Sequence, residues 1–198
     1  MLQTDHLSSV PPYDEMWAIA SDISDHKGAV DEFLPCLLDG LEHTPPTASV
    51  LEIGVWAGGS AIFTLWHLLQ EGQGRRLITV DHGGEQDDRP LYDYARQHGC
   101  NWVHNIYDQH VWVKQLPLLG YRFGFVYHDG QHGDASVVPD VLAIAPFIVP
   151  GGTLAVDDAH ECVSGLSFAH LGLETVTDYY PPHRGCGGIN FYRKVPPN

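Results

Sequence analysis

The chain has 198 residues, enough for one compact domain with its own core and too few for two ordinary ones. Lys and Arg total 10 against 25 Asp and Glu, and the resulting net charge of −15 argues against nucleic acid as a partner, because the chain would repel a phosphate backbone. Apolar residues make up 43% of the sequence and its 21 glycines and 14 prolines follow no repeat, which argues against a disordered, collagen-like or solenoid chain.

A helix is expected in the N-terminal quarter of the chain. Apolar residues recur at helical spacing over Asp25–Leu41, and Pro35 inside this range could kink or split the helix. Gly40 and the pair Pro45-Pro46 then predict the end of the helical region. We therefore expect residues 1–48 to form a helical cap before the first strand.

The middle of the chain alternates between short apolar runs and amphipathic segments, which indicates an α/β fold with a mainly parallel sheet covered on both faces. The apolar runs predict strands at Ser49–Ile53, Leu77–Val80, Trp102–Ile106, Phe123–Tyr127 and Thr153–Val156. The amphipathic segments predict helices at Ala61–Leu69, Pro90–His98 and Val137–Ile148. A turn is predicted before the last of these strands, at Pro150-Gly151-Gly152.

The C-terminal part of the chain has a different pattern. Leu173–Thr177 and Ile189–Arg193 both have the composition of strands, and the Pro- and Gly-rich stretch Tyr180–Gly188 joins them. This arrangement predicts an antiparallel strand pair. Because no linker-like segment divides the chain, we expect residues 1–198 to form a single domain whose core spans residues 49–198.

The sequence predicts a cytoplasmic protein. No apolar run reaches the roughly 18–20 residues of a membrane span. The N-terminus, Met1–Pro12, has no basic region and no apolar core, so it does not resemble a signal peptide. The scattered cysteines form no CxxC pair and are expected to be free thiols; they are Cys36, Cys100, Cys162 and Cys186.

Polar residues follow each predicted parallel strand, at the edge of an open α/β sheet where ligands bind. The segment Gly54–Ser60 follows the first strand, and its glycines would let the turn approach a ligand closely. It is not a Walker loop, since no Gly-Lys-Ser/Thr follows, and its spacing differs from the G-x-G-x-x-G pattern that holds a pyrophosphate. Asp81 ends the second strand, where a carboxylate can accept hydrogen bonds from both hydroxyls of a ribose. The alternative is a tight strand-to-helix turn without a ligand.

Four segments in this order resemble the motifs of class I S-adenosylmethionine-dependent methyltransferases. The resemblance is closest to the metal-dependent sugar O-methyltransferases that modify macrolide and aminocoumarin natural products. The segments are Leu51–Ser60, Asp108-Gln109, Phe123–His132 and Pro150–Asp158. The ordered set is more specific than the glycine turn alone, because it includes Asp-Gly-x-His and a later Asp-Asp pair. The resemblance implies a Rossmann-like class I methyltransferase fold, with residues 49–198 as the S-adenosylmethionine-binding core.

The resemblance also implies which residues bind the cofactor. Residues of the glycine turn and of the strand before it would surround the methionine end, and Asp81 would bind the ribose. Residues after the third strand would border the adenine, although Asp108 could instead serve only as a helix N-cap. The full predicted set is Glu52, Gly54, Trp56, Ser60, Asp81, Tyr107, Asp108, Gln109 and Asp129.

Three carboxylates, Asp129, Asp157 and Asp158, end two strands that are expected to be neighbours. Carboxylates gathered at one site repel each other unless they are protonated or bridged by a cation. A hard divalent ion resolves this repulsion, with Mg²⁺ first and Mn²⁺ or Ca²⁺ as alternatives. The resemblance implies the same three residues as metal ligands. Alternatively, the Asp157-Asp158 pair only caps the following loop by accepting hydrogen bonds from backbone amides.

His132, three residues after Asp129, is the predicted catalytic base. Methyl transfer to an alcohol requires that the hydroxyl lose its proton as it attacks the sulfonium methyl group. A metal lowers the pKa of the hydroxyl, and an imidazole can accept the proton near neutral pH. The resemblance implies this role for the histidine of Asp-Gly-x-His. The alternative is a surface histidine near a helix N-terminus.

Two further histidines and several aromatic residues lie near these motifs in the sequence. His128 stands where the resembled family often has an acid, and His160 follows Asp158 closely. Either could bind the metal as an additional nitrogen ligand, which would favour Mn²⁺, Fe²⁺ or Zn²⁺. Alternatively, each lies behind the metal ligands or at the rim of the site. Aromatic side chains that could line an acceptor pocket, or simply pack in the core, are Trp17, Trp56, Tyr179, Tyr180 and His183.

The expected function is S-adenosylmethionine-dependent methyl transfer to a hydroxyl of a small molecule, a sugar or natural product, with a divalent metal. Three alternatives remain at this point: a metal-independent methyltransferase acting on nitrogen or a carboxylate, a methyltransferase-like domain that binds a ligand without chemistry, and a nicotinamide-dependent oxidoreductase. The expected partner is a small hydroxylated acceptor rather than nucleic acid or a membrane. A second subunit could contribute to acceptor specificity, so a homo-oligomer is compatible with the sequence.

Overall fold

The computed structural model describes residues 10–24, 27–83, 87–159, 163, 165–176 and 188–196. The helices are α1 (Tyr13–Ile23), α2 (Lys27–Glu42), α3 (Gly59–Glu71), α4 (Arg89–His98), α5 (Gln109–Val113), α6 (Leu116–Leu119), α7 (Asp134–Ile144) and the 3₁₀ turns η1 (Ala145–Phe147) and η2 (Ala169–Leu171). The strands are β1 (Ser49–Ile53), β2 (Leu77–Asp81), β3 (Trp102–Ile106), β4 (Phe123–His128), β5 (Ile148–Val156), β6 (Leu173–Thr175) and β7 (Asn190–Lys194).

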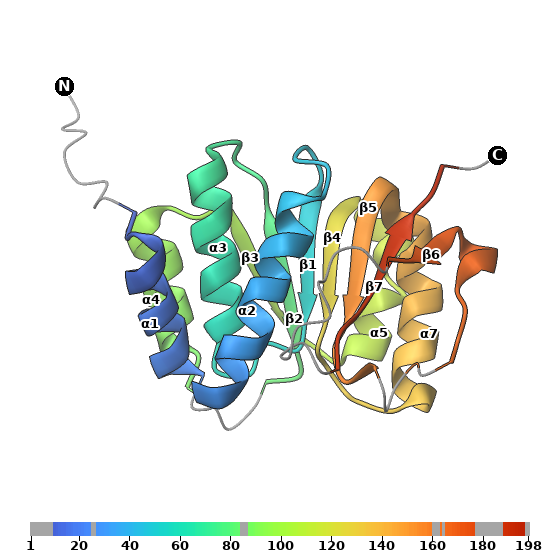
Figure 1. The fold of residues 1–198 in the computed structure, drawn as a ribbon, viewed down its shortest axis with the longest axis horizontal. Coiled ribbons are helices and arrows are strands. Elements are labelled where there is room, and N and C mark those ends of the chain that lie inside the picture. Colours follow the sequence, from blue (N-terminus) through green and yellow to red (C-terminus); the bar gives the residue numbers. More distant parts are fainter. Residues whose placement is uncertain are drawn as a thin grey trace.

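The strands form one seven-stranded sheet in the order β3-β2-β1-β4-β5-β7-β6, with helices on both sides (Figure 1). Strands β1 to β5 pair in parallel, whereas β7 is antiparallel to both β5 and β6. The prediction of an α/β fold with a mainly parallel sheet and an antiparallel C-terminal pair is therefore confirmed. From β1 the chain builds the sheet outward through β2 and β3, then returns to place β4 on the other side of β1, which creates a switch point between β1 and β4.

Two apolar clusters cover the two faces of the sheet. One joins α1, α2, α3 and α4 to the face that carries Val50 and Phe125, and the other joins α5, α6 and α7 to the face that carries Leu51 and Val126. Because successive strand residues point to opposite faces, every apolar position of β1 and β4 finds a buried environment. The continuous apolar runs in the sequence follow from this double coverage.

The structure adds helices that the sequence pattern did not predict, namely α1, α5 and α6. Trp66 Nε1 donates a hydrogen bond to the Pro11 carbonyl at 2.7 Å, which ties the segment before α1 to α3. Pro35 does not split α2, which runs continuously from Lys27 to Glu42. These helices depend on packing against neighbours that are distant in sequence, so local periodicity alone underestimates them.

The predicted turn at Pro150-Gly151-Gly152 lies within the bounds of β5 and not before the strand, but the chain does turn there, since Gly151 has a φ of 79°. Phe123 of β4 pairs with Ile148 whereas Phe125 pairs with Thr153, so four residues of β5 stand opposite one residue of β4 and the pairing register shifts there. The predicted helix at 137–148 is also shifted: α7 spans Asp134–Ile144 and tightens into η1. Pro146 has no N–H to donate, so an α-helical hydrogen bond is lost there.

The cysteines only partly follow the expectation of free thiols. Cys100 is free, but Cys36, which is fully buried, is disulfide-bonded. This corrects the prediction for Cys36, because spacing along the sequence does not reveal which thiols meet after folding. Cys162 and Cys186 lie outside the described residues. Within the described ranges, no helix combines the length and the apolar character needed to span a membrane.

Candidate active site

A cavity of about 500 Å³ opens where β1, β2 and β4 end. It contains seven of the residues singled out from the sequence together with three that were not, His82, Gly130 and Gln131. His82 follows a strand-end carboxylate and Gln131 lies inside the Asp-Gly-x-His motif, so both positions carried a weak sequence signal. The lining residues are Gly54, Trp56, Asp81, His82, Asp108, Gln109, Asp129, Gly130, Gln131 and His132.

The glycine turn after β1 brings the backbone of two strands into close contact. Gly54 has a φ of 83°, and a Cβ at this position would overlap the carbonyl group of Asp129. The Asp129 amide in turn donates to the Ile53 carbonyl at 2.7 Å. Trp56, with a φ of 50°, is one of two non-glycine residues with positive φ in the described part of the chain, and it is 56% exposed. A strained backbone beside a cavity is a common property of binding turns.

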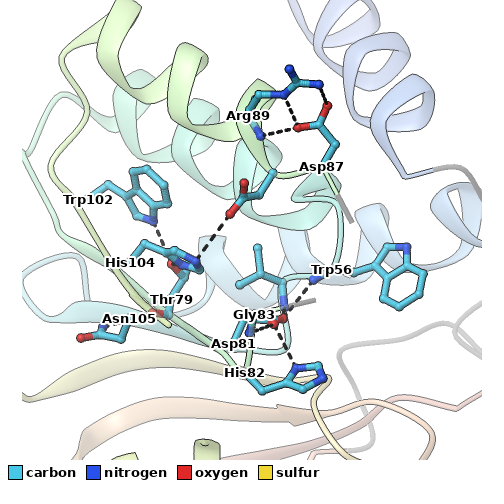
Figure 2. Close-up of polar contacts among 12 residues, drawn as sticks. Trp56, Thr79, Asp81, His82, Gly83, Asp87, Arg89, Trp102, His104 and Asn105 are labelled. Carbon is cyan, nitrogen blue, oxygen red and sulfur yellow. Dashed lines mark hydrogen bonds and ion pairs between the residues drawn. The ribbon is translucent and has the colours of Figure 1, made fainter. Parts of the chain in front are cut away.

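Asp81 holds the glycine turn through backbone amides. Its Oδ2 accepts hydrogen bonds from the amides of Val55 at 2.8 Å and Trp56 at 3.2 Å, and its Oδ1 accepts one from Gly83 at 2.9 Å (Figure 2). Burial alone would raise the pKa of Asp81, but these hydrogen bonds outweigh it and lower the pKa below its usual value. The carboxylate is therefore ionised at neutral pH. Figure 2 also shows the Trp56 indole pointing away from it.

A polar cluster from β2 and β3 lies beside Asp81, where Thr79 precedes it by two residues along β2. Thr79 Oγ1 is 2.7 Å from His104 Nδ1 and accepts a hydrogen bond from Trp102 Nε1 at 2.9 Å (Figure 2). Burial lowers the pKa of His104, and its ring stacks on that of Trp102 with centroids 5.5 Å apart. The end of β2 is thereby fixed on the side away from β1.

Glu52 is a buried acid beneath the cavity and does not line it. Only 1% of its surface is exposed, and Ser60, in the first turn of α3, donates a hydrogen bond to it. Burial raises the pKa of Glu52 to about 8, with the Ser60 hydrogen bond opposing the rise and the charge of Asp81 adding to it. A cation bound above it would favour the ionised form.

Asp129 and Asp157, which end the adjacent strands β4 and β5, lie close together. The Tyr127 hydroxyl is 3.2 Å from Asp129 Oδ2 and 3.0 Å from Asp157 Oδ2. Burial, followed by the charge of Asp157, raises the pKa of Asp129 well above its usual value. Two carboxylates in this arrangement require a shared proton or a cation. Their oxygen donors are of the kind that Mg²⁺ prefers.

Asp158 is directed differently from these two carboxylates. Its Oδ2 lies 3.1 Å from Nδ1 of His132, and both side chains are nearly half exposed. Asp158 has a φ of 46°, which turns the chain away from the line of β5. In the described part of the chain, no three His, Cys, Asp or Glu side chains gather as a metal-binding group. The structure thus brings together two of the three predicted ligands and pairs the third with the predicted base.

Residues after β3 border the cavity from the side of α5. Asp108 caps this helix by accepting a hydrogen bond from the Val111 amide at 2.9 Å, so the N-cap interpretation is correct, and it also lines the cavity. Tyr107, 47% exposed, is not among the lining residues. Gln109 lines the cavity and donates a hydrogen bond to Asp140 Oδ2 at 2.8 Å. Asp140 belongs to α7, and the sequence pattern did not single it out.

The remaining candidates from the sequence are spread over different environments. His128 is buried, and its Nε2 lies 3.2 Å from Asp140 Oδ2, on the α7 side of the sheet. Trp17 packs against the core cluster of α1 to α4. The other acceptor and ligand candidates fall outside the described residues; they are His160, Tyr179, Tyr180 and His183.

Comparisons with known proteins identify the family and the fold of the chain. A family model described as a methyltransferase domain matches residues 51–159, more than half of the chain. No curated protein matches the chain in sequence. Among solved structures, the fold is similar to that of CalS11, a TDP-rhamnose 3′-O-methyltransferase of calicheamicin biosynthesis, with 16% identity, a TM-score of 0.65 and coverage of 94% of this chain and 89% of CalS11.

Two other structures are similar to a comparable extent. A Corynebacterium glutamicum protein has 16% identity and a TM-score of 0.66 over 97% of this chain and 95% of its own. MycE, a methyltransferase of the mycinamycin pathway in complex with Mg, S-adenosylhomocysteine and mycinamycin VI, has 19% identity and a TM-score of 0.59. The match covers 91% of this chain but 53% of MycE, so the chain spans about half the length of MycE. The protein belongs to the methyltransferase domain family and is a class I S-adenosylmethionine-dependent methyltransferase.

Proposed function

We propose that the protein transfers a methyl group from S-adenosylmethionine to a hydroxyl of a small molecule, a sugar or other natural product, with the help of a divalent ion. The observation that carries the proposal is the cavity at the β1–β4 switch point, where Asp81, Asp129 and His132 surround one space. CalS11 is a sugar O-methyltransferase and MycE was solved with Mg and S-adenosylhomocysteine, which supports the same chemistry here.

The proposed cofactor residues fall into three groups around this cavity. Glu52, Gly54 and Ser60 would surround the methionine end, where the high pKa of Glu52 would fall as a cation binds. Asp81 would accept hydrogen bonds from the ribose hydroxyls, since each carboxylate oxygen has more than one acceptor site. The adenine would lie at the α5 side of the cavity; the residues proposed there are Tyr107, Asp108 and Gln109, with Trp56 and Asp129 at its border.

His132 is the proposed catalytic base. Asp158 Oδ2 is 3.1 Å from its Nδ1, and an Nδ1–H held by a carboxylate leaves Nε2 as the basic nitrogen. In the reaction the acceptor oxygen forms a bond to the methyl carbon, the carbon–sulfur bond breaks to leave S-adenosylhomocysteine, and the hydroxyl proton passes to the imidazole. Asp158 would stabilise the imidazolium that results.

The proposed metal ligands are Asp129, Asp157 and Asp158, and Mg²⁺ is the preferred ion. The contact between Asp129 and Asp157 supports this, because it places oxygen ligands at one point and because a cation bound there would lower the raised pKa of Asp129. A divalent ion held there would lower the pKa of an acceptor hydroxyl. The pairing of Asp158 with His132 favours a second candidate, a metal-independent methyltransferase in which the His–Asp pair alone removes the proton.

We also propose that residues 1–198 form a single domain, with residues 1–48 as a cap, that acts in the cytoplasm. The proposed methyl acceptor is a small hydroxylated molecule. The net charge of −15 argues against nucleic acid as a substrate or partner. A membrane is not an expected partner. A homo-oligomer would be one way of completing an acceptor pocket.

Calorimetry with S-adenosylmethionine and S-adenosylhomocysteine tests the cofactor assignment. We expect both to bind, and Asp81→Asn to weaken both, because an amide accepts fewer hydrogen bonds and releases the glycine turn. Asp93→Asn is the matched control, since Asp93 is an exposed residue of α4 paired with Arg96. Absence of binding at millimolar concentration would refute the proposal. Methylation that persists after exhaustive chelation would favour the metal-independent candidate.

A further inference from the structure

A buried carboxylate of α7, on the same side of the sheet as α5, joins the residues that border the α5 side of the cavity. Asp140 of α7 is 1% exposed and contacts polar atoms of three side chains. Its Oδ2 accepts from Gln109 Nε2 at 2.8 Å and lies 3.2 Å from His128 Nε2. Its Oδ1 lies 2.9 Å from His110 Nδ1. Two of these partners come from α5 and the third from the end of β4, so one carboxylate joins three elements.

Gln109 and His110 also contact the loop that follows β4, through the side-chain atoms that do not face Asp140. Gln109 Oε1 accepts a hydrogen bond from the Gln131 amide at 2.9 Å, and His110 Nε2 lies 3.2 Å from Gln131 Oε1. A Cβ on Gly130 would overlap the Gln109 side chain, so the loop lies directly against α5. Gln109, Gln131 and His132 all line the cavity. Asp140, by contrast, is not a lining residue and reaches the cavity through its partners alone.

The charge of Asp140 determines which way the Gln109 amide points. A carboxylate has no hydrogen to donate, so it can face only the NH₂ group of Gln109. The Gln109 carbonyl oxygen is then left to accept the hydrogen bond from the Gln131 amide. If residue 140 carried an amide instead, it could turn either its oxygen or its NH₂ toward Gln109, so the orientation of Gln109 would no longer be fixed. In the flipped orientation the Gln109 NH₂ would meet the Gln131 N–H, and this hydrogen bond would be lost, so the amide of Gln131 would be protected for only part of the time.

We propose that Asp140 is a positioning residue of the methyltransferase site, which fixes the orientation of Gln109 and thereby holds residues 129–132 in the geometry that binds the cofactor. The part of this proposal that concerns the cofactor rests on the proposed function. The part that concerns the loop rests on the hydrogen bonds alone. The two parts are therefore tested by separate measurements.

Asp140→Asn is the direct test, because the side chain keeps its size and loses its charge. In the absence of any ligand, the Gln131 amide should exchange its hydrogen about tenfold faster than in the unaltered protein, while the amides of β4 and β5 keep their protection. The affinity for S-adenosylhomocysteine should fall about tenfold, the size expected when one buried hydrogen bond is left unmade. Asp134→Asn, an exposed position at the start of the same helix, should change neither value.

A reciprocal exchange separates positioning from simple core stability. In the double variant Asp140→Asn with Gln109→Glu, the amide and the carboxylate change places. The new NH₂ group at position 140 would face the new carboxylate at position 109, whose second oxygen again accepts from the Gln131 amide. Hydrogen exchange at Gln131 should return toward the original value; cofactor affinity is not the readout for this variant, because Gln109 itself lines the cavity. If Asp140→Asn fails to fold but the double variant folds and protects Gln131, the proposal is supported. If neither folds, Asp140 serves the core alone and the proposal is overturned.

The remaining outcomes are also decisive. Unchanged Gln131 exchange in a folded Asp140→Asn variant would overturn the proposal whatever happens to the cofactor. Faster Gln131 exchange with unchanged affinity for S-adenosylhomocysteine would overturn the link to the site. If the unaltered protein binds no S-adenosylhomocysteine, the proposed function fails, yet the exchange measurement still tests the orientation of Gln109.

Discussion

The imidazole of His132 and the carboxylate of Asp158 face each other, with Nδ1 of His132 3.1 Å from Oδ2 of Asp158. The two residues come from different loops: His132 lies in the loop after β4, and Asp158 lies in the loop after β5. The pair connects the predicted base to a predicted metal ligand. It implies that proton transfer and any metal binding at this site depend on each other.

His132→Ala should lower methyl transfer about 10²–10⁴-fold, the usual contribution of a general base, and leave the affinity for S-adenosylhomocysteine nearly unchanged. Steady-state turnover with a hydroxylated acceptor found by screening, together with calorimetry, measures the two effects. His170→Ala is a suitable control, because His170 is an exposed histidine on η2. An equal loss of turnover and cofactor affinity in His132→Ala would contradict a role as base.

Mg²⁺ should raise the melting temperature of the protein, because a cation relieves the repulsion between Asp129 and Asp157. A concentration of 100 times the dissociation constant stabilises by about 2.7 kcal/mol, which corresponds to a shift of roughly 5–10 °C for a chain of this length. Asp157→Asn should abolish the shift, whereas the exposed control Asp134→Asn should retain it. Equal shifts in both variants would place the ion elsewhere.

The free energy of unfolding should decrease as the pH rises from about 4.5 to about 8, because of the buried Glu52. In the unfolded chain its pKa is near 4.5, and in the folded protein burial raises the pKa to about 8. Between these values the folded state holds a proton that the unfolded state has lost, so the free energy of unfolding decreases with increasing pH. The total effect is roughly 3–5 kcal/mol.

Glu52→Gln should remove this share of the pH dependence and stabilise the protein at pH 8, since a neutral amide can still accept the Ser60 hydrogen bond. Urea unfolding between pH 5 and pH 8 measures the effect, and Glu174→Gln, an exposed position on β6, serves as the control. Parallel stability curves for Glu52→Gln and the unaltered protein would show that Glu52 is ionised in the folded state.

Gly54→Ala should destabilise the protein more than Gly72→Ala. Both glycines have positive φ, 83° and 64°, so both substitutions carry a backbone cost of about 1–2 kcal/mol. A Cβ on Gly72 meets nothing within 4 Å, whereas one on Gly54 overlaps the Asp129 carbonyl group. Thermal unfolding compares the two variants, and Gly54→Ala should also lose S-adenosylhomocysteine binding. Similar melting temperatures for the two variants would mean that the backbone at Gly54 and Asp129 can move apart at little cost in free energy, which would contradict the close contact.

The strands and the glycine turn were predictable from the sequence because their signals are local. The run Ser49–Ile53 is apolar and short, and the structure has a strand with the same bounds. The turn after it needs glycine at positions where φ is positive, which leaves a mark in the sequence itself. By contrast, α1 and the continuation of β5 through Pro150 depend on partners far away in the chain, and local patterns did not show them.

The sequence by itself determined which residue types stand at the strand ends, and therefore that an acidic site lies at the edge of the sheet. Which of these residues meet was decided by the tertiary structure. Parallel pairing of His128 with Val156 places Asp129 beside Asp157, whereas the positive φ of Asp158 turns its side chain toward His132. Asp140 gave no signal, because a buried carboxylate is recognisable only when α5, α7 and β4 bring its three partners together. Register and side-chain direction are long-range properties, so they become visible only once the sheet has formed.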